Sequence, residues 1–291
     1  MRLSLPERAF SVFNGLLLML LAVGTLYPFY HVLMASFSDS KQLIAHSGVL
    51  LRPLGFQLDA YQAVLDNPNI LNGYRNTIVI VVTGTLINLI MTTVAAYALS
   101  RTFMLKNTLL MMIVFTMFFS GGLIPNFLLV NNFLHMGGTY WALILPSAIN
   151  SWNLIVMITS MRSIPESLIE SARMDGAGEF RVLLRIVVPL SMPVISVMLL
   201  YYGVAHWNSW FQALLYLRDR ETFPLQLILR EILIFKNTES MSIGAGVGDQ
   251  EAIGESIRYA TIMVATLPIL LVYPFLQKYF VKGVMVGAIK E

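Results

Sequence analysis

Six long apolar segments constrain the fold of this chain more than any other feature of its sequence. They cover about residues 9–34, 76–99, 108–130, 140–161, 194–217 and 259–280. Each approaches or exceeds the roughly 20 residues that a helix needs to cross the hydrocarbon core of a bilayer. Since only 12% of the residues are charged, about half the share in a soluble domain, we expect an all-α membrane protein with six transmembrane helices in one domain, residues 1–291.

The placement of Lys and Arg predicts the orientation of these helices. Arg2 and Arg8 precede the first segment, which is too long for the apolar region of a signal peptide and is followed by no A-x-A cleavage site, so we expect it to be retained. If the N-terminus is cytoplasmic, the inner segments hold more than half of the Lys and Arg residues. We therefore expect both termini and the loop 163–193 to be cytoplasmic, and the long loop 218–258 to be external.

Several classes of chemistry are disfavoured. The chain has no cysteine, no G-x-x-x-x-G-K-[ST] motif for nucleotide, and four scattered histidines without the spacing of metal ligands. Basic residues are spread over loops rather than gathered in a patch for nucleic acid. No Asp, Glu, Lys or Arg lies well inside a predicted span, whereas ion-coupled carriers usually hold such groups there. We expect neither catalysis nor a metal site in this chain, and an external energy source if it transports a solute.

The loop 163–193, SIPESLIESARMDGAGEFRVLLRIVVPLSMP, is a charged island between apolar segments, here called the polar loop. Ser163 and Glu166 have the spacing of a capping box, which predicts a helix over about 164–175. Gly176 suits the left-handed conformation that ends a helix. A second short helix is predicted over about 179–187, with Pro189 and Pro193 ending it.

At these residues the chain resembles a known signature. The spacing E-A-A-x3-G-x9-I-x-L-P is that of the "EAA" loop in permease subunits of binding-protein-dependent ABC importers, and it matches Glu170, Ser171, Ala172, Gly176, Ile186, Val188 and Pro189. Two positions depart from it, because Ser171 replaces Ala and Val188 replaces Leu. The alternative is an amphipathic interfacial helix without a partner.

The resemblance implies a coupling helix that docks on a separate ATPase. The residues that it assigns to this coupling are Glu170, Ser171, Ala172, Arg173, Asp175, Gly176, Ala177, Phe180, Ile186 and Pro189. It also implies a heterodimer with a second, related permease, a pair of P-loop ATPase subunits that hold ATP and magnesium, and an extracytoplasmic solute-binding protein. The setting is the cytoplasmic membrane of a prokaryote, with lipid around the helices.

Neutral amides and aromatic rings inside the spans are the candidates for solute contact. The set comprises Trp152, Asn153, His206, Trp207, Asn208 and Trp210. Such side chains suit sugars, whose C–H faces stack on rings and whose hydroxyls need paired donors and acceptors. The competing interpretation is that the amides join helices and that Trp anchors them at the interface.

Read whole, the chain resembles the carbohydrate-uptake class of these permeases and is similar to the smaller maltose-importer permease. The stretches FFSGGLIPNFLLV, YWALILPSAINSWN, HWNSWFQALLY and PLQLILREIL are similar to permeases that import oligosaccharides such as alginate or pectin fragments. The tail VKGVMVGAIKE also resembles this class. Two other functions remain as alternatives: a secondary carrier, and a membrane scaffold or receptor that moves no solute.

Overall fold

The computed structural model describes residues 5–234, 254–271 and 274, and the regular secondary structure in these ranges is helical. Within them the chain forms two compact units. The first contains the described residues up to Ile70 together with Leu229–Leu267, and the second contains Leu71–Ile228 together with the described residues from Pro268 onward. The whole polar loop belongs to the second unit.

The first unit is built around a corner between two helices. α1 (Leu5–Ser36) ends shortly before α2 (Ser40–Ala45), whose first turn is capped by Asp39 through a hydrogen bond from the Gln42 amide (3.0 Å). The Ser40 hydroxyl is hydrogen-bonded to that of Ser256, so this corner contacts a helix over residues 254–271. α3 (Asp59–Leu65) follows, and α14 (Leu225–Ile234) passes from the second unit into the first.

Two helices are long and apolar enough to span a membrane alone, α1 and α4 (Pro68–Ser100), and they contain the predicted segments 9–34 and 76–99. Three further candidates are bent pairs: Lys106–Phe118 with Leu123–Phe133 (111°), Trp141–Ser147 with Ser151–Arg162 (48°), and Glu179–Leu190 with Met192–Trp207 (82°). The described residues therefore hold two to five candidate spans. The predicted segment 259–280 leaves the described ranges after residue 271, as do residues 235–253 of the predicted external loop and the tail, so the count of six stays a prediction.

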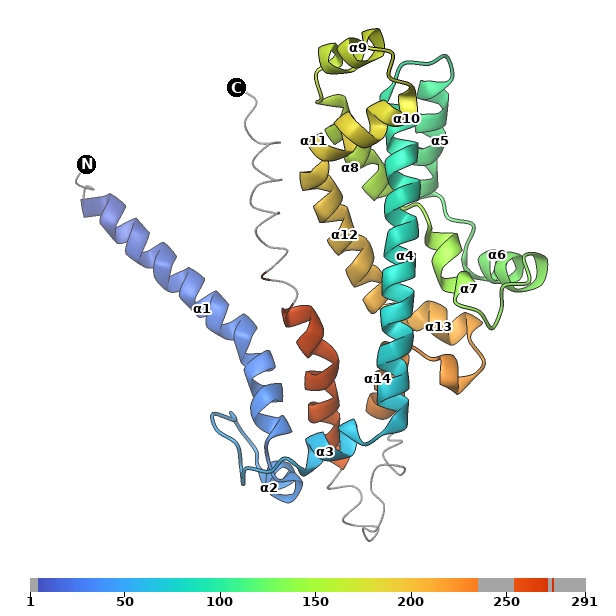
Figure 1. Ribbon diagram of the computed structural model, residues 1–291. Coiled ribbons are helices and arrows are strands. Elements are labelled where there is room, and N and C mark those ends of the chain that lie inside the picture. Colours follow the sequence, from blue (N-terminus) through green and yellow to red (C-terminus); the bar gives the residue numbers. More distant parts are fainter. Residues whose placement is uncertain (1–4, 235–253, 272–273, 275–291) are drawn as a thin grey trace. The chain divides into compact units, whose positions relative to one another are not determined.

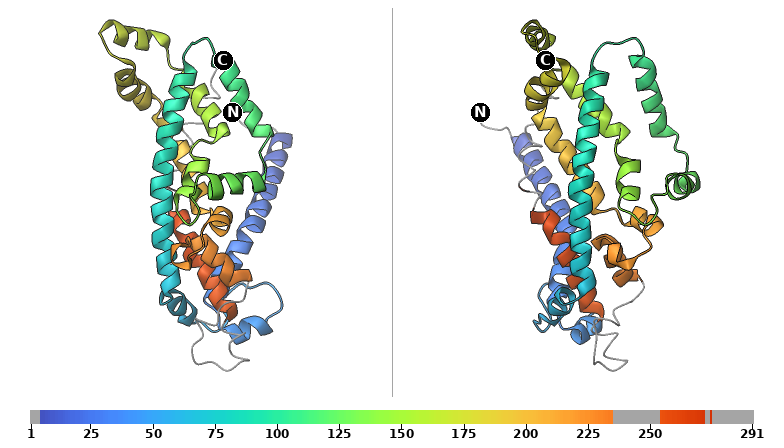
Figure 2. Two further views of the ribbon diagram at one scale, coloured as in Figure 1. Left: turned by 90° about the vertical axis from the view of Figure 1, so that its right-hand side faces the viewer. Right: turned by 45° about the vertical axis from the view of Figure 1, so that its right-hand side comes forward.

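In the second unit, α4 runs from one end to the other (Figure 1). The half of α4 that ends at Ser100 lies beside three helices, α5 (Lys106–Phe118), α8 (Ser151–Arg162) and α12 (Met192–Trp207) (Figures 1 and 2). The short helices α6 (Leu123–Leu128), α7 (Trp141–Ile144) and α13 (Trp210–Tyr216) lie nearer its middle. α9 (Glu166–Met174), α10 (Glu179–Val182) and α11 (Val188–Leu190) gather at its Ser100 end.

The third apolar segment, residues 108–130, is broken into two helices. α5 ends at Phe118, and α6 begins after Gly122, whose φ of +87° is a conformation that only glycine adopts easily. Pro125 lies in the first turn of α6, where its missing N–H would have no partner in any case. A π-helical turn, Leu129–Phe133, continues this helix.

Polar side chains of α4 satisfy the backbone where neighbouring segments are irregular. Asn76 donates hydrogen bonds to the carbonyl oxygens of Glu221 (2.7 Å) and Phe223 (3.0 Å). The hydroxyl of Thr77 accepts a bond from the amide of Leu225 (2.9 Å) at the start of α14. A buried backbone group without a partner costs about 1–3 kcal/mol, so these bonds allow the chain to leave helical geometry beside α4.

The same arrangement recurs farther along α4. Asn88 is fully buried and donates to the carbonyl oxygens of Ser147 (2.6 Å) and Ala148 (3.0 Å), where α7 and its following 3-10 turn, Leu145–Ser147, give way to α8. One turn later the hydroxyl of Thr92 bonds that of Tyr202 on α12 (2.7 Å). We refer to Asn76, Thr77, Asn88 and Thr92 as the α4 polar ladder.

The predicted capping box at the start of α9 is wrong. The hydroxyl of Ser163 donates to the carbonyl oxygen of Ser160 (2.7 Å), one turn back in α8, and α9 has no side-chain cap. α9 begins at Glu166, after Pro165 in an extended conformation (ψ 130°), without a side-chain cap. A serine between two helices has a choice of two backbone partners, and here it bonds the helix that precedes it.

The prolines also do not end the second short helix where they were predicted to. After α10 the chain continues through a π-helical turn, Leu183–Val187, into α11, and Pro189 lies in the first turn of α11. Pro193 likewise lies in the first turn of α12, and the 82° bend falls at Ser191 between them. A first turn tolerates proline because the missing N–H has no helical partner there.

The α4 polar ladder leads to a first prediction. Replacing Asn76 with Leu keeps the side chain's size but leaves two carbonyl oxygens without donors, at a cost of about 1–3 kcal/mol. We expect the purified protein in detergent to show a lower apparent Tm, followed by intrinsic fluorescence. Asn72→Leu is the matched control, because Asn72 lies one turn earlier on α4 and is exposed. Equal Tm values for the two variants would contradict a stabilising role for the ladder.

Candidate functional site

The end of α9 has the geometry of a Schellman motif. Gly176 has a φ of +78°, its amide donates to the carbonyl oxygen of Arg173 (3.0 Å), and the amide of Ala177 donates to that of Ala172 (2.9 Å). These are the two bonds that close a helix when the residue after the C-cap is left-handed. The predicted turn at Gly176 is thus confirmed, and it reverses the chain between α9 and α10.

One side of α9 is held against the ends of the long helices. Ile169 is fully buried in a cluster that includes Leu99 of α4, Met161 of α8 and Val182 of α10. Ala172 and Ala177 pack against the same cluster and are half-buried. The turn at Gly176 is therefore seated on the unit rather than being a free loop.

The other side of α9 is open to its surroundings. Met174 is 88% exposed and Phe180 is 71% exposed, so two large apolar side chains that flank the turn are left largely uncovered by the described residues. Of the ten residues assigned to coupling, three are half-buried, Ala172, Ala177 and Ile186, and seven are exposed: Glu170, Ser171, Arg173, Asp175, Gly176, Phe180 and Pro189. The structure brings the residues from Glu170 to Phe180 together around one turn.

Sequence reasoning missed the ionic contact that joins the polar loop to α4. The guanidinium of Arg173 lies 2.7 Å (Nη2) and 2.9 Å (Nε) from one carboxylate oxygen of Glu179, and the hydroxyl of Tyr97 donates to the other. Arg101 stacks on the ring of Tyr97, 4.8 Å from its centroid. We call the contact of Tyr97, Glu179 and Arg173 the Glu179 bridge.

Glu179 lies in the polar loop, between the predicted spans 140–161 and 194–217, at the start of the segment that turns by 82° away from α12. The hydrogen bond from Tyr97 and then the guanidinium of Arg173 hold the pKa of its carboxyl below the ordinary value, and partial desolvation opposes them. The carboxylate is therefore ionised at neutral pH, as the bridge requires. The charge of Glu179 was visible in the sequence, but nothing local linked it to a tyrosine 82 residues earlier.

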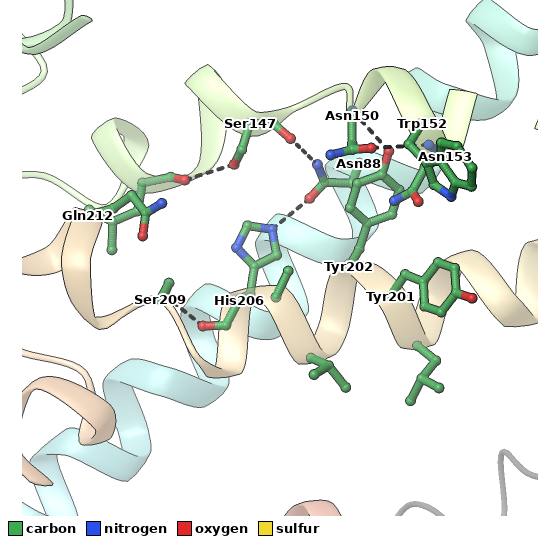
Figure 3. Close-up of a pocket in the computed structure, with 14 residues that line it drawn as sticks. Asn88, Ser147, Asn150, Trp152, Asn153, Tyr201, Tyr202, His206, Ser209 and Gln212 are labelled. Carbon is green, nitrogen blue, oxygen red and sulfur yellow. Dashed lines mark hydrogen bonds between the residues drawn. The ribbon is translucent and has the colours of Figure 1, made fainter. Parts of the chain in front are cut away.

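A polar cavity of about 580 Å³ lies between α4, the start of α8 and α12 (Figure 3). Its lining residues are uncharged and are rich in amides, hydroxyls and aromatic rings. They are Asn88, Leu143, Ser147, Asn150, Trp152, Asn153, Leu200, Tyr201, Tyr202, Val204, Ala205, His206, Ser209 and Gln212. Trp152 is 60% exposed, so the cavity presents an accessible indole face as well as hydrogen-bonding groups.

His206 is fixed by Asn88. Its Nε2 lies 2.6 Å from Oδ1 of Asn88, and the Nδ2 of that amide is committed to the carbonyl oxygens of Ser147 and Ala148. The amide orientation is therefore set, and Nε2 of His206 must carry the hydrogen that it donates. Gly84, one turn before Asn88, makes room for the ring, because a Cβ there would lie 2.5 Å from Nε2.

The start of α8 closes one side of the cavity. The side-chain oxygen of Asn150 caps α8 by accepting a hydrogen bond from the backbone amide of Asn153 (3.1 Å). The backbone amide of Asn150 donates to the hydroxyl of Tyr202 (3.2 Å). Since Tyr202 also bonds Thr92, one hydroxyl links α4, α8 and α12. Figure 3 shows Asn150 and Tyr202 beside Asn88 of α4.

The six residues predicted to contact solute separate into two groups. Trp152, Asn153 and His206 line the polar cavity, although His206 is only 5% exposed and is engaged with Asn88. Trp207, Asn208 and Trp210 lie outside its lining, and Trp207 instead faces a second, apolar cavity of about 720 Å³.

Asn88 was missed as a lining residue. The signal was a single amide in the apolar run TLINLIM, because an asparagine inside a span needs a partner there.

Among the described residues, no three His, Asp or Glu side chains converge as metal ligands would.

The sequence of this chain is similar to those of known transport proteins. Residues 91–286 match the family model of the "binding-protein-dependent transport system inner membrane component". The chain is 38% identical over 290 residues to the polygalacturonan/rhamnogalacturonan transport system permease protein YtcP of Bacillus subtilis, covering 98% of this chain and 100% of that protein. It is 41% identical to protein LplC of the same organism, covering 97% and 95%.

A solved structure is also similar. It belongs to a bacterial ABC transporter involved in the import of the acidic polysaccharide alginate, and it matches with a TM-score of 0.87 and 30% identity over 96% of this chain and 99% of that one. Because the family model covers most of the chain and a relative spans it at 38% identity, this protein belongs to the multi-pass, non-catalytic inner membrane permeases of binding-protein-dependent transport systems.

Proposed function

We propose that this permease carries an oligosaccharide across the inner membrane and is driven by separate ATPase subunits that dock on the turn between α9 and α10. The observation that carries the proposal is the exposed Schellman turn at Gly176, which is seated on the ends of α4 and α8 and bears the residues of the family signature. ATP and magnesium would be held by those subunits. A second, related permease and an extracytoplasmic binding protein would complete the importer.

The exposed side of α9 suits a protein partner. Met174 and Phe180 present apolar surface beside the charges of Glu170 and Asp175. Apolar residues rimmed by charges are typical of protein interaction sites. The polar loop and both termini would then be cytoplasmic, as the distribution of Lys and Arg predicts.

Two observations favour an oligosaccharide as the solute. Full-length relatives are named for the transport of polygalacturonan, rhamnogalacturonan and alginate. The polar cavity offers the indole of Trp152 and the amides of Asn153 and Gln212, which suit the C–H faces and the hydroxyls of a sugar. His206 would shape the cavity through its hydrogen bond to Asn88 rather than contact the solute directly, because its ring is buried.

Coupling requires that ATP binding favour one of two arrangements of the permease. Closure of the ATPase pair would displace α9, and the helices packed on it would move between inward-open and outward-open states. A turn of fixed shape transmits such a displacement, whereas a flexible loop would absorb it.

Two substitutions of Gly176 test the role of the turn. Gly176→Val forces a β-branched residue into a left-handed conformation, at about 1–2 kcal/mol, although space around the position is open. Gly176→Pro also removes the amide that bonds Arg173. We expect both variants to insert in the membrane but to lose ATP-driven uptake, measured in proteoliposomes with oligogalacturonides and oligoalginates as probes.

Gly178→Val is the matched control for this experiment. Gly178 has a φ of −71° and equal open space, so valine fits its extended backbone. We expect near-normal uptake from this control. Normal uptake by Gly176→Pro would refute the assignment of the turn.

The polar cavity gives a separate prediction. Trp152→Leu removes the exposed indole and should raise the apparent KM for uptake several-fold, with assembly and basal ATP hydrolysis unchanged. Trp141→Leu is the control, because Trp141 is similarly exposed on α7 but does not line the cavity. An unchanged KM for Trp152→Leu would remove Trp152 from the solute path.

The partners can be identified directly. A tagged chain, purified gently from native membranes, should bring a second permease and a P-loop ATPase in stoichiometric amounts, detected by mass spectrometry. Recovery of this chain alone, from a preparation that keeps other complexes intact, would refute the proposed assembly.

A further inference from the structure

The Glu179 bridge connects three parts of the second unit through one carboxylate. Arg173 is on the last turn of α9, Glu179 is the first residue of α10, and Tyr97 is on the last turn of α4. Both oxygens of the carboxylate are used, one by the guanidinium and one by the hydroxyl. α9 is thereby tied to α4 through polar contacts, across a chain separation of more than seventy residues.

These contacts differ in kind from the apolar packing beneath them. Ile169 and Val182 hold α9 and α10 onto α4 and α8, but burial of apolar surface has no preferred direction and permits small sliding movements. Charge-assisted hydrogen bonds fix both distance and direction. The bridge therefore adds a directional link to a contact that would otherwise be able to slip.

α4 extends this link into the membrane. Tyr97 lies nine residues after Asn88 in one uninterrupted helix, which corresponds to about 14 Å along its axis. Asn88 holds His206 and the two carbonyl groups at the break before α8. A displacement of α4 at Tyr97 would therefore change the hydrogen bonds that shape the polar cavity.

We propose that Glu179 is a positioning residue that transmits the displacement of α9 to α4, so that ATP hydrolysis is coupled to movement of the cavity. The inference rests on the proposed docking of ATPase subunits at α9. It also gives Arg173 a role within the chain, because its guanidinium is turned onto Glu179 instead of outward.

The experiment compares variants in the complete complex with its ATPase subunits and binding protein in proteoliposomes. Glu179→Met removes both contacts and keeps an unbranched side chain at an exposed position. Tyr97→Phe removes only the contact with α4 and keeps the ring beneath Arg101. Glu166→Met is the matched control, because Glu166 is an exposed acid at the opposite end of α9.

Both bridge variants should assemble with the ATPase and hydrolyse ATP, but the amount of sugar moved per ATP should fall by about fivefold or more. The probe is whichever of the oligogalacturonides or oligoalginates the wild-type complex transports. The double variant should be no worse than the single variants, because the contacts act as one unit. A spin label at the exposed Met174 should report greater mobility of α9 in both variants.

Three results would overturn the inference. These are an unchanged ratio of sugar to ATP, effects of the two substitutions that multiply in the double variant, and loss of ATPase assembly, which would place Glu179 in the docking surface itself. Failure of the proposed function looks different, because the wild-type complex would then neither bind an ATPase nor move either probe.

Discussion

The constraint on which this structure depends is that buried backbone groups must be hydrogen-bonded wherever the chain departs from helical geometry. Three of the candidate spans are pairs of helices bent by 48° to 111°. The freed carbonyl groups at two irregular segments are bonded by asparagines of α4, Asn76 and Asn88, which lie twelve residues apart on one straight helix. α4 is thus the element that allows its neighbours to depart from helical geometry.

Because of this constraint, Asn88 serves both the helix break and the wall of the polar cavity. Its side-chain nitrogen donates to the carbonyl oxygen of Ser147 at the break before α8, and its side-chain oxygen accepts a hydrogen bond from His206. The same side chain therefore serves the break and the cavity wall. Tyr202 does the same for the start of α8, bonding both Thr92 and the amide of Asn150. Sequence reasoning weighed packing against solute contact for such residues, and in the structure His206 and Tyr202 contribute to helix packing while lining a cavity.

What the sequence predicted well was encoded locally. The long apolar runs predicted α1 and α4, and Gly176 predicted a left-handed turn. What it did not predict depends on partners distant in sequence, as for Tyr97 with Glu179 or Asn88 with His206. The error at Ser163 has another cause, since a hydroxyl between two helices has two acceptable partners and the pattern of residues does not choose between them.

The chemistry of the polar cavity bears on how the transporter must be driven. Its lining residues carry no charged side chain, and the one titratable imidazole among them already donates to Asn88. Under the proposed function, solute release from this cavity would follow from a change in the shape of the cavity, since its lining holds no carboxylate of the kind that ion-coupled carriers bury. Since Asn88 and Tyr97 lie on the same helix, the role proposed for the Glu179 bridge is to carry work done on α9 to that shape.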